Sequence, residues 1–391
     1  MTIAIAAPAR RSGRWLEDPG FGVYVHIPFC LHRCHYCDFN TYEGQEELHE
    51  RYVDALIRDV ERNVVDRPAT SVFFGGGTPT LLAPRALGRI LDAVRDSIGI
   101  AGDAEITVEA NPETVDATAF EGLLGVGFNR FSVGVQSLVP RVLEGLGRTH
   151  GADTATDALR AARRAGVEDI NADLIYGSPW ETDDDWRATL ARIVDEGPDH
   201  VSAYALTVEE STPLATMVAT GRVPNVDGDV QAARHEVAEE FFGTAGYERY
   251  EISNWSHPGR ASAHNVLYWS AGDYLGFGAG AHGHVAGRRS WATRLPRDFI
   301  AAVDGGTTTE SGYERLDDDA RAGEALILGL RLATGIDLAG FTRRFGPRAL
   351  ERRDEAIARY LDSGLLERAE NALRLSGRGT MLANEVQAAL L

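Results

Sequence analysis

The sequence predicts an α/β protein: a partial barrel of six strand–helix units, followed by a smaller C-terminal domain of helices and one hairpin. Two observations predict this fold. Up to about residue 250, short apolar runs alternate with segments whose apolar residues recur at helical spacing, which is typical of a parallel sheet. From about residue 305 the pattern changes to consecutive helices and a hairpin, an order that resembles winged-helix modules. A chain of 391 residues is long enough for both parts.

The first strand–helix unit begins with the apolar run at residues 23–27, and six such units fit a partial barrel better than a closed eight-stranded one. In such barrels, ligands sit at the C-terminal ends of the strands. Further strands are predicted at 71–74, 106–110, 131–135, 169–175 and 200–206. Helices are predicted at 48–62, 84–97, 116–124, 140–146, 152–165, 182–195 and 229–246.

The chain divides into four predicted parts. Residues 1–19 form a disordered lead-in, 20–250 the barrel core, 251–304 a connecting segment that contains the sequence H-N-x-x-Y-W, and 305–391 the C-terminal domain. A strand-like stretch at 247–255 spans the boundary between the core and the connecting segment. Within that domain we expect helices at 317–333, 337–345 and 350–361, a hairpin at 365–375 and a last segment at 385–391. We interpret this domain as a lid or docking domain.

Composition excludes several functional classes. The net charge of −19 disfavours nucleic acid and anionic lipid as partners, despite the arginine pairs at 343–344 and 352–353. No apolar run reaches about 18 residues, so no membrane-spanning helix is expected. The charge order at the N-terminus is wrong for a signal peptide, and three cysteines without a pairing logic indicate a reducing cytoplasm.

All three cysteines lie in one short loop after the first strand. Cys30, Cys34 and Cys37 have the spacing C-x3-C-x2-C, so their thiolates can converge on one metal centre. Zinc with His26, His32 or His35 as fourth ligand remains an alternative, as do three unrelated core cysteines. An odd count disfavours disulfides. Since a [4Fe–4S] cluster usually has four thiolate ligands, three would leave one iron open for a small molecule, and this interpretation is favoured.

A glycine-rich loop follows the second strand. Three consecutive glycines, at 75–77, and Thr78 allow the backbone to approach a ligand closely, and its N–H groups could hold a polar or anionic group. Polar residues also end the later strands: Glu109, Gln136 and Asp173, with Arg148 a short loop beyond. Each taken alone could be a structural residue, but together they are expected to line one mouth of the barrel. A carboxylate within an apolar run is costly to bury unless it is paired.

These motifs resemble the radical S-adenosylmethionine (radical SAM) superfamily, with Tyr36 as the aromatic residue before the last cysteine. YVHIPFC and CDFN resemble the oxygen-independent coproporphyrinogen III oxidase group, and within it the HemW-type heme chaperones. The resemblance implies a [4Fe–4S] cluster on the three cysteines and S-adenosylmethionine on its open iron, cleaved by one electron to a 5′-deoxyadenosyl radical. It implies cofactor contacts at Tyr24, Tyr36, Gly76, Gly77, Thr78, Glu109, Gln136, Arg148 and Asp173.

The segment H-N-x-x-Y-W begins at His264 and resembles a motif of HemW-type proteins. By that resemblance His264 is a heme ligand, and Tyr268 and Trp269 are expected to cover a porphyrin face. A histidine beside aromatic residues is also common in protein cores, so a structural role stays open. His282 and His284 follow in a glycine-rich stretch and are weaker ligand candidates, expected to be structural.

Two functions are compatible with a porphyrin ligand. One is a heme chaperone that delivers heme to acceptor proteins such as respiratory hemoproteins. The other is coproporphyrinogen III dehydrogenase, which decarboxylates two propionates to vinyl groups. The dehydrogenase branch has a further cysteine two residues after the third, where this chain has Phe39. With the H-N-x-x-Y-W motif, this favours the chaperone. A second S-adenosylmethionine, a homodimer and peripheral association with membrane hemoproteins all remain open.

Overall fold

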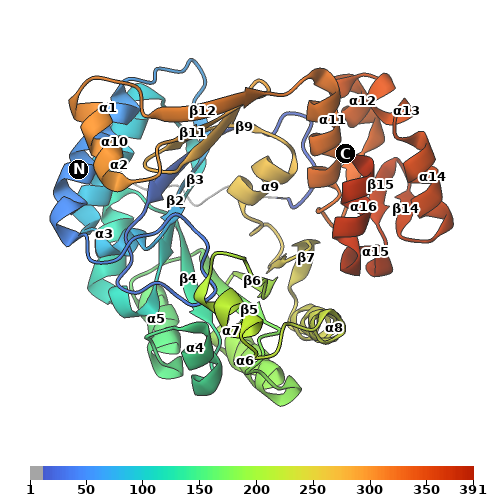
Figure 1. Cartoon of the computed structure of the whole chain (residues 1–391), viewed down its shortest axis with the longest axis horizontal. Coiled ribbons are helices and arrows are strands. Elements are labelled where there is room, and N and C mark those ends of the chain that lie inside the picture. The colour runs from blue at the N-terminus through green and yellow to red at the C-terminus, as the bar shows by residue number, and fades with distance from the viewer. Residues whose placement is uncertain (1–11) are drawn as a thin grey trace.

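The structure is a computed structural model that describes residues 12–391. A large twisted sheet with helices around it forms the main body, and a smaller helical module lies beside it (Figure 1). The strands of the large sheet are β1 (Phe21–Ile27), β2 (Ala69–Gly76), β3 (Ile100–Ala110), β4 (Arg130–Gln136), β5 (Ile170–Tyr176), β6 (His200–Ala205), β7 (Glu248–Glu251), β8 (Asn254–Ser256), β9 (Asp273–Phe277), β10 (His282–Val285), β11 (Arg288–Ala292) and β12 (Glu310–Arg315).

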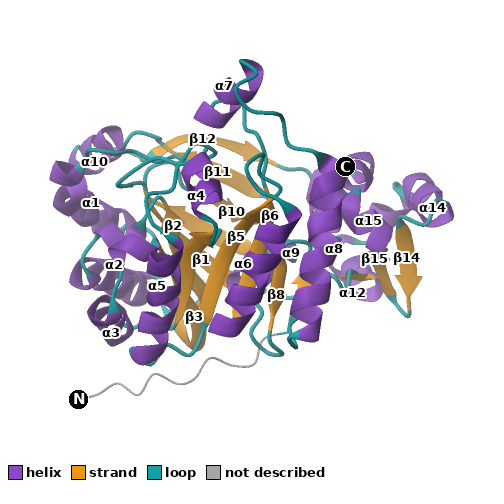
Figure 2. Ribbon diagram, turned by 90° about the horizontal axis from the view of Figure 1, so that it is seen from below, coloured by secondary structure: helices purple, strands orange, loops and turns teal. Residues whose placement is uncertain are grey.

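Strands β1 to β6 pair in parallel and in sequence order, which confirms the predicted α/β class and its six-unit core. Helices cover the outer face of these strands (Figure 2). They are α1 (His49–Glu61), α2 (Pro84–Ser97), α3 (Ala117–Val126), α4 (Pro140–Leu146), α5 (Ala152–Arg164), α6 (Asp183–Glu196) and α8 (Gly228–Thr244). Helix α7 (Pro213–Ala219) stands apart from the sheet (Figure 2), and its Leu214 N donates to His35 O at 2.9 Å. Because all six strands run in the same direction, their C-terminal ends lie together at one end of the sheet.

Local sequence explains where these elements begin and end. Asp116 caps α3 by accepting a hydrogen bond of 2.8 Å from Ala119 N, and the helix ends at Gly127, whose φ of 112° suits glycine. Six of the seven residues of β1 are buried, as expected for a strand covered on both faces. Tyr24 is the exception, because its side chain points toward the interior of the partial barrel, where a cavity lies.

The sheet extends beyond the six predicted strands on both edges. In the described residues it has 12 strands, in the order β12-β11-β10-β9-β1-β2-β3-β4-β5-β6-β8-β7. β9 pairs in parallel with β1, and β10, β11 and β12 follow as antiparallel neighbours. A Cβ on Gly276 would lie 1.9 Å from the carbonyl oxygen of His282, so the glycines of this stretch do permit close backbone packing.

The C-terminal part combines helices with a three-stranded antiparallel sheet. Its hairpin at 366–375 was predicted, whereas the third strand, which pairs with the second strand of that hairpin, was not. The predicted helix over 350–361 is divided in two, near Arg352. The remaining elements are α9 (Ala263–Trp269), α10 (Pro296–Asp304), α11 (Asp318–Gly329), β13 (Ile336–Asp337), α12 (Leu338–Phe345), α13 (Arg348–Glu351), α14 (Asp354–Asp362), β14 (Leu366–Ala369), β15 (Ala372–Leu375), α15 (Gly377–Met381) and α16 (Ala383–Leu390).

Part of the expected disordered lead-in packs against this C-terminal part. Residues 1–11 lie outside the described residues. Beyond them, Trp15 is 8% exposed, its ring lies 6.5 Å from the ring of Phe341, and Glu17 forms an ion pair with Arg343 at 2.6 Å. Residues 12–19 therefore differ from the expectation, because an aromatic side chain gives them a place in the core.

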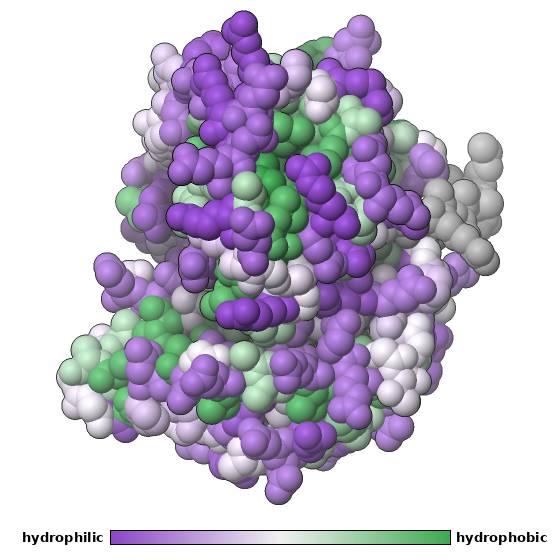
Figure 3. Space-filling model, turned by 90° about the vertical axis from the view of Figure 1, so that its right-hand side faces the viewer, coloured by the Kyte–Doolittle hydropathy of each residue, from purple (hydrophilic) through white to green (hydrophobic). Residues whose placement is uncertain are grey.

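The side of the molecule that bears the C-terminal helices has a mixed surface (Figure 3). Hydrophilic residues dominate it, and hydrophobic residues show as a strip in the upper centre and as smaller patches in the lower half. Among the described residues, none of the helices combines the length and the apolar character needed to cross a bilayer.

Candidate functional site

The cysteine loop is tied down at both ends by backbone hydrogen bonds. Tyr42 N donates to Pro28 O at 2.8 Å and Cys30 N donates to Tyr42 O at 3.0 Å, which closes the loop just beyond β1. Farther along, His35 N donates to Leu146 O at 3.0 Å, at the end of α4. The loop is thus fixed between the first and fourth strand–helix units, and its three thiols lie at the C-terminal ends of the strands.

The three sulfur atoms are partly or fully buried and lie near polar side chains. Thr78 Oγ1 donates to Cys30 Sγ at 3.8 Å, and Arg148 Nη1 donates to Cys34 Sγ at 3.5 Å. Burial raises the pKa of Cys30 to about 11 and also raises the pKa of Cys37. A metal that binds here must therefore displace thiol protons, and the Arg148 guanidinium suits a thiolate at Cys34.

The arrangement of these sulfurs fits a cluster better than a single metal ion. Within residues 12–391, no three His, Cys, Asp or Glu side chains lie close enough to hold one metal ion. His26 and His35 also have ring nitrogens that are hydrogen-bonded to the backbone oxygens of Asn40 and Gly145, at 2.9 and 3.0 Å. A [4Fe–4S] cluster takes each thiolate on a different iron, so it accepts ligands that stand farther apart.

The glycine loop has a different chemistry from the one expected. The amide of Gly76 donates to Glu109 Oε2 at 3.0 Å, that of Gly77 to Ile27 O at 2.8 Å and that of Thr78 to Phe29 O at 2.7 Å. The protein itself uses these three N–H groups, contrary to the expectation that they could hold a polar or anionic group of a ligand. What the loop can offer is carbonyl oxygen, an acceptor that suits an amino group.

Most of the predicted site residues line one cavity of about 350 Å³ at the C-terminal strand ends. Tyr24 and His264 are the two exceptions. The predicted residues that line it are Cys30, Cys34, Tyr36, Cys37, Gly76, Gly77, Thr78, Glu109, Gln136, Arg148 and Asp173. We call this space the first cavity.

Arg148 holds a central position in the first cavity. Its Nη2 donates to Asn111 Oδ1 at 2.7 Å and to Gly134 O at 3.0 Å, while Nη1 reaches Cys34. Among the described residues, its buried Nε–H has no hydrogen-bond partner. A buried donor without a partner is costly, so this one favours an anionic ligand such as a carboxylate.

Backbone strain marks the end of β4. Gln136 has a φ of 64°, in the left-handed region that residues other than glycine rarely adopt. The pairing of β4 with β5 shifts register just before this residue. At Gly134, a Cβ would lie 3.0 Å from Gln136 Nε2 and 3.3 Å from Asn111 Oδ1. Glycine at 134 therefore leaves room for polar side chains to converge, a concentration typical of ligand sites.

Two buried carboxyl groups stand on neighbouring parts of the same wall. Asp173 accepts hydrogen bonds from Ser132 Oγ at 2.7 Å and Asn171 Nδ2 at 2.8 Å. Burial, and secondarily the charge of Asp173, raises the pKa of Glu109 to about 8. Burial also raises the pKa of Asp173. Such a pair favours a ligand that offers hydroxyl or cationic groups, because either would offset the cost of ionisation.

The raised pKa of Glu109 predicts a pH dependence of stability. The folded protein holds this proton up to about pH 8, whereas the unfolded chain releases it near 4.5. Stability from this group is therefore full below pH 4.5 and is lost as the pH rises through about 8. We expect Glu109→Gln to gain thermal stability relative to the wild-type apoprotein between pH 5 and 8. Melting temperatures measured across this pH range test the prediction, and Glu168→Gln, at an exposed position, is the control. An equal change of melting temperature with pH in Glu109→Gln and wild type would contradict it.

Tyr24 lines a neighbouring cavity of about 520 Å³, which we call the second cavity. The two cavities share Phe39, Gly76 and Glu109 as lining residues, so they adjoin along the C-terminal edge of β2 and β3. Tyr24 places its hydroxyl 2.8 Å from His26 Nδ1. Its predicted contact with the cofactor therefore requires a ligand that reaches past Glu109.

His264 lines neither cavity. Its side chain is fully enclosed, with Nδ1 2.9 Å from Ser71 Oγ and Nε2 2.9 Å from the hydroxyl of Tyr268. Burial lowers its pKa to about 4, so the ring is neutral. Because both ring nitrogens are engaged, this structure gives no open nitrogen to a heme iron, and the ligand role of His264 stays a prediction. Trp269 also differs from expectation, since it lies under the Arg331 guanidinium at 4.4 Å and lines neither the first nor the second cavity.

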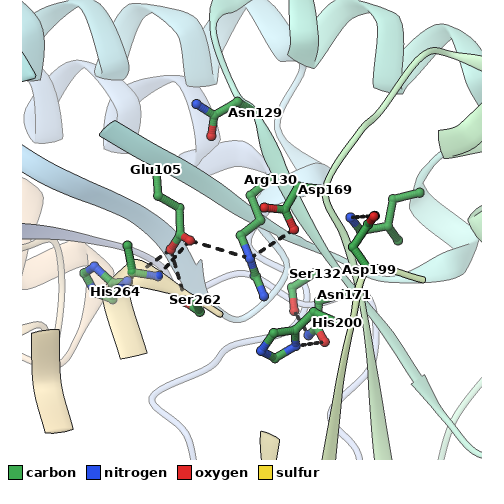
Figure 4. Close-up of polar contacts among 12 residues, drawn as sticks. Glu105, Asn129, Arg130, Ser132, Asp169, Asn171, Asp199, His200, Ser262 and His264 are labelled. Atoms are coloured by element: carbon green, nitrogen blue, oxygen red, sulfur yellow. Dashed lines mark hydrogen bonds and ion pairs between the residues drawn. The ribbon is translucent and has the colours of Figure 1, made fainter. Parts of the chain in front are cut away.

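A buried ionic network holds the start of α9 against the sheet, as Figure 4 shows. Arg130 Nε lies 3.7 Å from Glu105 Oε2 and 3.5 Å from Asp169 Oδ1, and all three side chains are at most 3% exposed. Glu105 also accepts hydrogen bonds from Ser262 Oγ at 3.1 Å and from the amides of Ala263 and His264 at 2.9 and 3.1 Å. The network thus fixes the helix that carries Tyr268.

Comparisons with known proteins agree with this geometry. A family model of the radical SAM superfamily matches residues 24–193, and one of the HemN C-terminal domain matches residues 316–382. Heme chaperone HemW of Mycobacterium tuberculosis is 41% identical over 377 residues, with 95% of each chain covered. The chain belongs to the HemW family of heme chaperones, in the radical SAM superfamily. Its relative in Bacillus subtilis is 32% identical, covering 94% of this chain and 98% of that protein.

A solved structure shares the fold of this HemW family member. It is coproporphyrinogen III oxidase (HemN) from Escherichia coli, described as a radical SAM enzyme, with a TM-score of 0.82 over 97% of this chain and 91% of that one. Its sequence is 21% identical, so the likeness shows the fold alone.

Sequence reasoning missed several cavity residues of this HemW family member. Asn111 bonds Thr78 at 2.9 Å as well as Arg148, and it follows Glu109 by two residues, so its place after β3 was a usable signal. Asn40 fastens the cysteine loop to the far edge of the sheet, donating to Ala279 O and Arg294 O at 2.9 Å. No local pattern could reveal that, because its partners lie more than 230 residues away.

Proposed function

We propose that this protein is a heme chaperone that holds a [4Fe–4S] cluster and S-adenosylmethionine in the first cavity and delivers heme to acceptor proteins. The observation that carries the proposal is the 41% identity with a HemW heme chaperone across 95% of both chains. The enclosed three-cysteine loop beside a polar cavity supports the cofactor part.

Each wall of the first cavity suits one part of these cofactors. Cys30, Cys34 and Cys37 would hold three irons, and the bound cluster would supply one electron to the sulfonium of S-adenosylmethionine. Arg148 would pair with the methionine carboxylate through its unpartnered Nε–H, and the glycine-loop carbonyls would accept the amino group. The carboxyl and amide groups of the strand ends would bind the ribose hydroxyls.

The second candidate function is that of coproporphyrinogen III dehydrogenase, which is compatible with the fold shared with the Escherichia coli oxidase. Phe39 disfavours it, since it occupies the position of the extra cysteine of that branch. Its side chain is 63% exposed and lines both cavities, so the chain offers a hydrophobic surface at that point and no thiol.

We expect the purified, cluster-loaded protein to bind ferric heme and to fail to rescue a strain that lacks coproporphyrinogen oxidase. A heme titration followed by absorbance measures the first, and an anaerobic decarboxylation assay with coproporphyrinogen III runs beside it. Binding without decarboxylation is the expected result. Rescue of the strain, or vinyl product in the assay, would replace the chaperone proposal with the dehydrogenase.

The acceptor proteins and the cellular compartment are also part of the proposed function. We propose respiratory hemoproteins as acceptors, reached from the cytoplasm by peripheral association, with residues 305–391 as the docking or lid domain. The three cysteines are free thiols in the structure, which is compatible with a reducing compartment. A pull-down with apoproteins of the respiratory chain, with and without residues 305–391, tests this part.

A further inference from the structure

The second cavity contains a histidine with open ring nitrogens. His282 begins β10 and is exposed, and its ring makes no hydrogen bond or ion pair to the described part of the chain. It stacks on Trp291, its partner in the β10–β11 pairing, at 5.9 Å and 29°. The other histidine of the cavity, His26, has both nitrogens engaged, with the hydroxyl of Tyr24 and with Asn40 O.

The walls of the second cavity suit a flat aromatic ligand. Its volume of about 520 Å³ lies within the usual range of small-molecule sites. Five aromatic side chains line it, each from a different element or loop, and two of them, Tyr268 and Tyr274, pack edge to face at 4.6 Å. The aromatic lining residues are Tyr24, Phe39, Tyr268, Tyr274 and Trp291.

A cation stands in the lining of the same cavity. Arg294 is exposed, its Nε donates to Asn40 Oδ1 at 3.3 Å, and it forms no ion pair within residues 12–391. On a chain with a net charge of −19, where most described arginines pair with carboxylates, such an arginine is suited to an external carboxylate.

We propose that an iron porphyrin binds in the second cavity, with a ring nitrogen of His282 as axial ligand to iron and Arg294 paired with a propionate. The inference deepens the proposed function and rests on it, because it assumes that heme is the cargo. Neutral imidazole is the ligating form, and burial together with Arg289 and Arg294 lowers the pKa of His282. Since the cavities share Glu109 and Phe39, heme here would lie next to the cofactor site.

If His282 is the iron ligand, His264 has a structural role in place of the ligand role expected from the sequence. The chain of contacts from Ser71 through His264 to the hydroxyl of Tyr268 sets the position of an aromatic wall of the second cavity. His264 is therefore a positioning residue. We expect His264→Ala to weaken heme binding while the absorption spectrum of the bound heme stays that of wild type, because the iron ligand is unchanged.

The test is a titration of ferric heme into the cluster-loaded protein, followed by absorbance and electron paramagnetic resonance. We expect His282→Ala to lose the histidine-ligated spectrum and at least about tenfold in affinity, and added imidazole to restore the spectrum. His284→Ala is the matched control, because His284 lies two residues along the same strand and faces other cavities. Iron and sulfide content should match wild type in both.

A second pair of variants tests the propionate contact. Arg294→Gln should lower the affinity for heme about two- to fivefold and leave the affinity for heme dimethyl ester unchanged. Arg297→Gln is the control, because Arg297 already pairs with Glu47. A wild-type heme spectrum in His282→Ala, or loss of that spectrum in His264→Ala, would overturn the inference while the chaperone function stands. If the wild type binds no heme, the proposed function fails as well.

Discussion

Alanine in place of Cys34 is expected to abolish binding of the proposed iron–sulfur cluster and to leave the fold intact. Only three thiolates are present in the whole chain, and each is expected to hold a different iron, so loss of one leaves the cube with too few ligands to persist. After anaerobic reconstitution we expect about four iron and four sulfide per wild-type chain and near-background values for Cys34→Ala. Far-ultraviolet circular dichroism should not change, because the substitution removes one sulfur from a loop that backbone hydrogen bonds hold.

His32→Ala is the matched control for that measurement. His32 sits in the same loop, with its side chain 46% exposed beside Glu43, and it is the histidine with most freedom to serve as a fourth zinc ligand. We expect His32→Ala to keep full iron content. Zinc in anaerobically prepared wild type, with loss of that zinc in both variants, would contradict the cluster and favour a mononuclear site.

Replacing Arg130 with methionine is expected to destabilise the protein by about 3–5 kcal/mol. The guanidinium lies between Glu105 and Asp169, and the side chains of both carboxylates are fully buried. Methionine fills similar space but leaves two buried negative charges without their cation, and such charges are far more costly than the salt bridge is favourable. Urea unfolding followed by tryptophan fluorescence measures the loss.

The control for Arg130 is an arginine on the surface. Arg160 pairs with Glu196 at 2.5 Å, but its side chain is 55% exposed, so Arg160→Met should change stability far less than Arg130→Met does. Because Glu105 also binds the amides at the start of α9, Arg130→Met should loosen the helix that carries Tyr268. Equal stability of the two variants would show that water or protonation neutralises the buried carboxylates.

The six parallel strands could be predicted because each combines a β-branched apolar run with a helix of clear periodicity. Helices such as α2 and α4 match the predicted ranges because proline fixes their first residue. The strands β9 to β12 were missed, since they are short and contain few β-branched residues. In addition, the pairing of β9 with β1, which joins them to the main sheet, is a contact over some 250 residues. Local pattern carries no information about such a contact.

The cofactor residues of the first cavity were predictable because they follow strand ends, where parallel topology brings them together. Which individual groups are free to bind a ligand was harder to predict from the sequence. Whether an amide in the glycine loop is free depends on where Glu109 and Ile27 lie, and whether His264 is open depends on Ser71, 193 residues away. A short motif names a residue type, but its neighbours in space decide what that residue can do.

The parallel pairing of β9 with β1 bears on how this protein could be divided. The strand that leads into the cysteine loop is an interior strand, protected by residues from the second half of the chain. A fragment ending at residue 193 would keep all three cysteines yet expose the backbone of β1 as a bare edge, the kind of surface that recruits other chains into aggregates. The N-terminal part that carries the cysteines therefore depends on β9, from the second half of the chain, to cover its first strand.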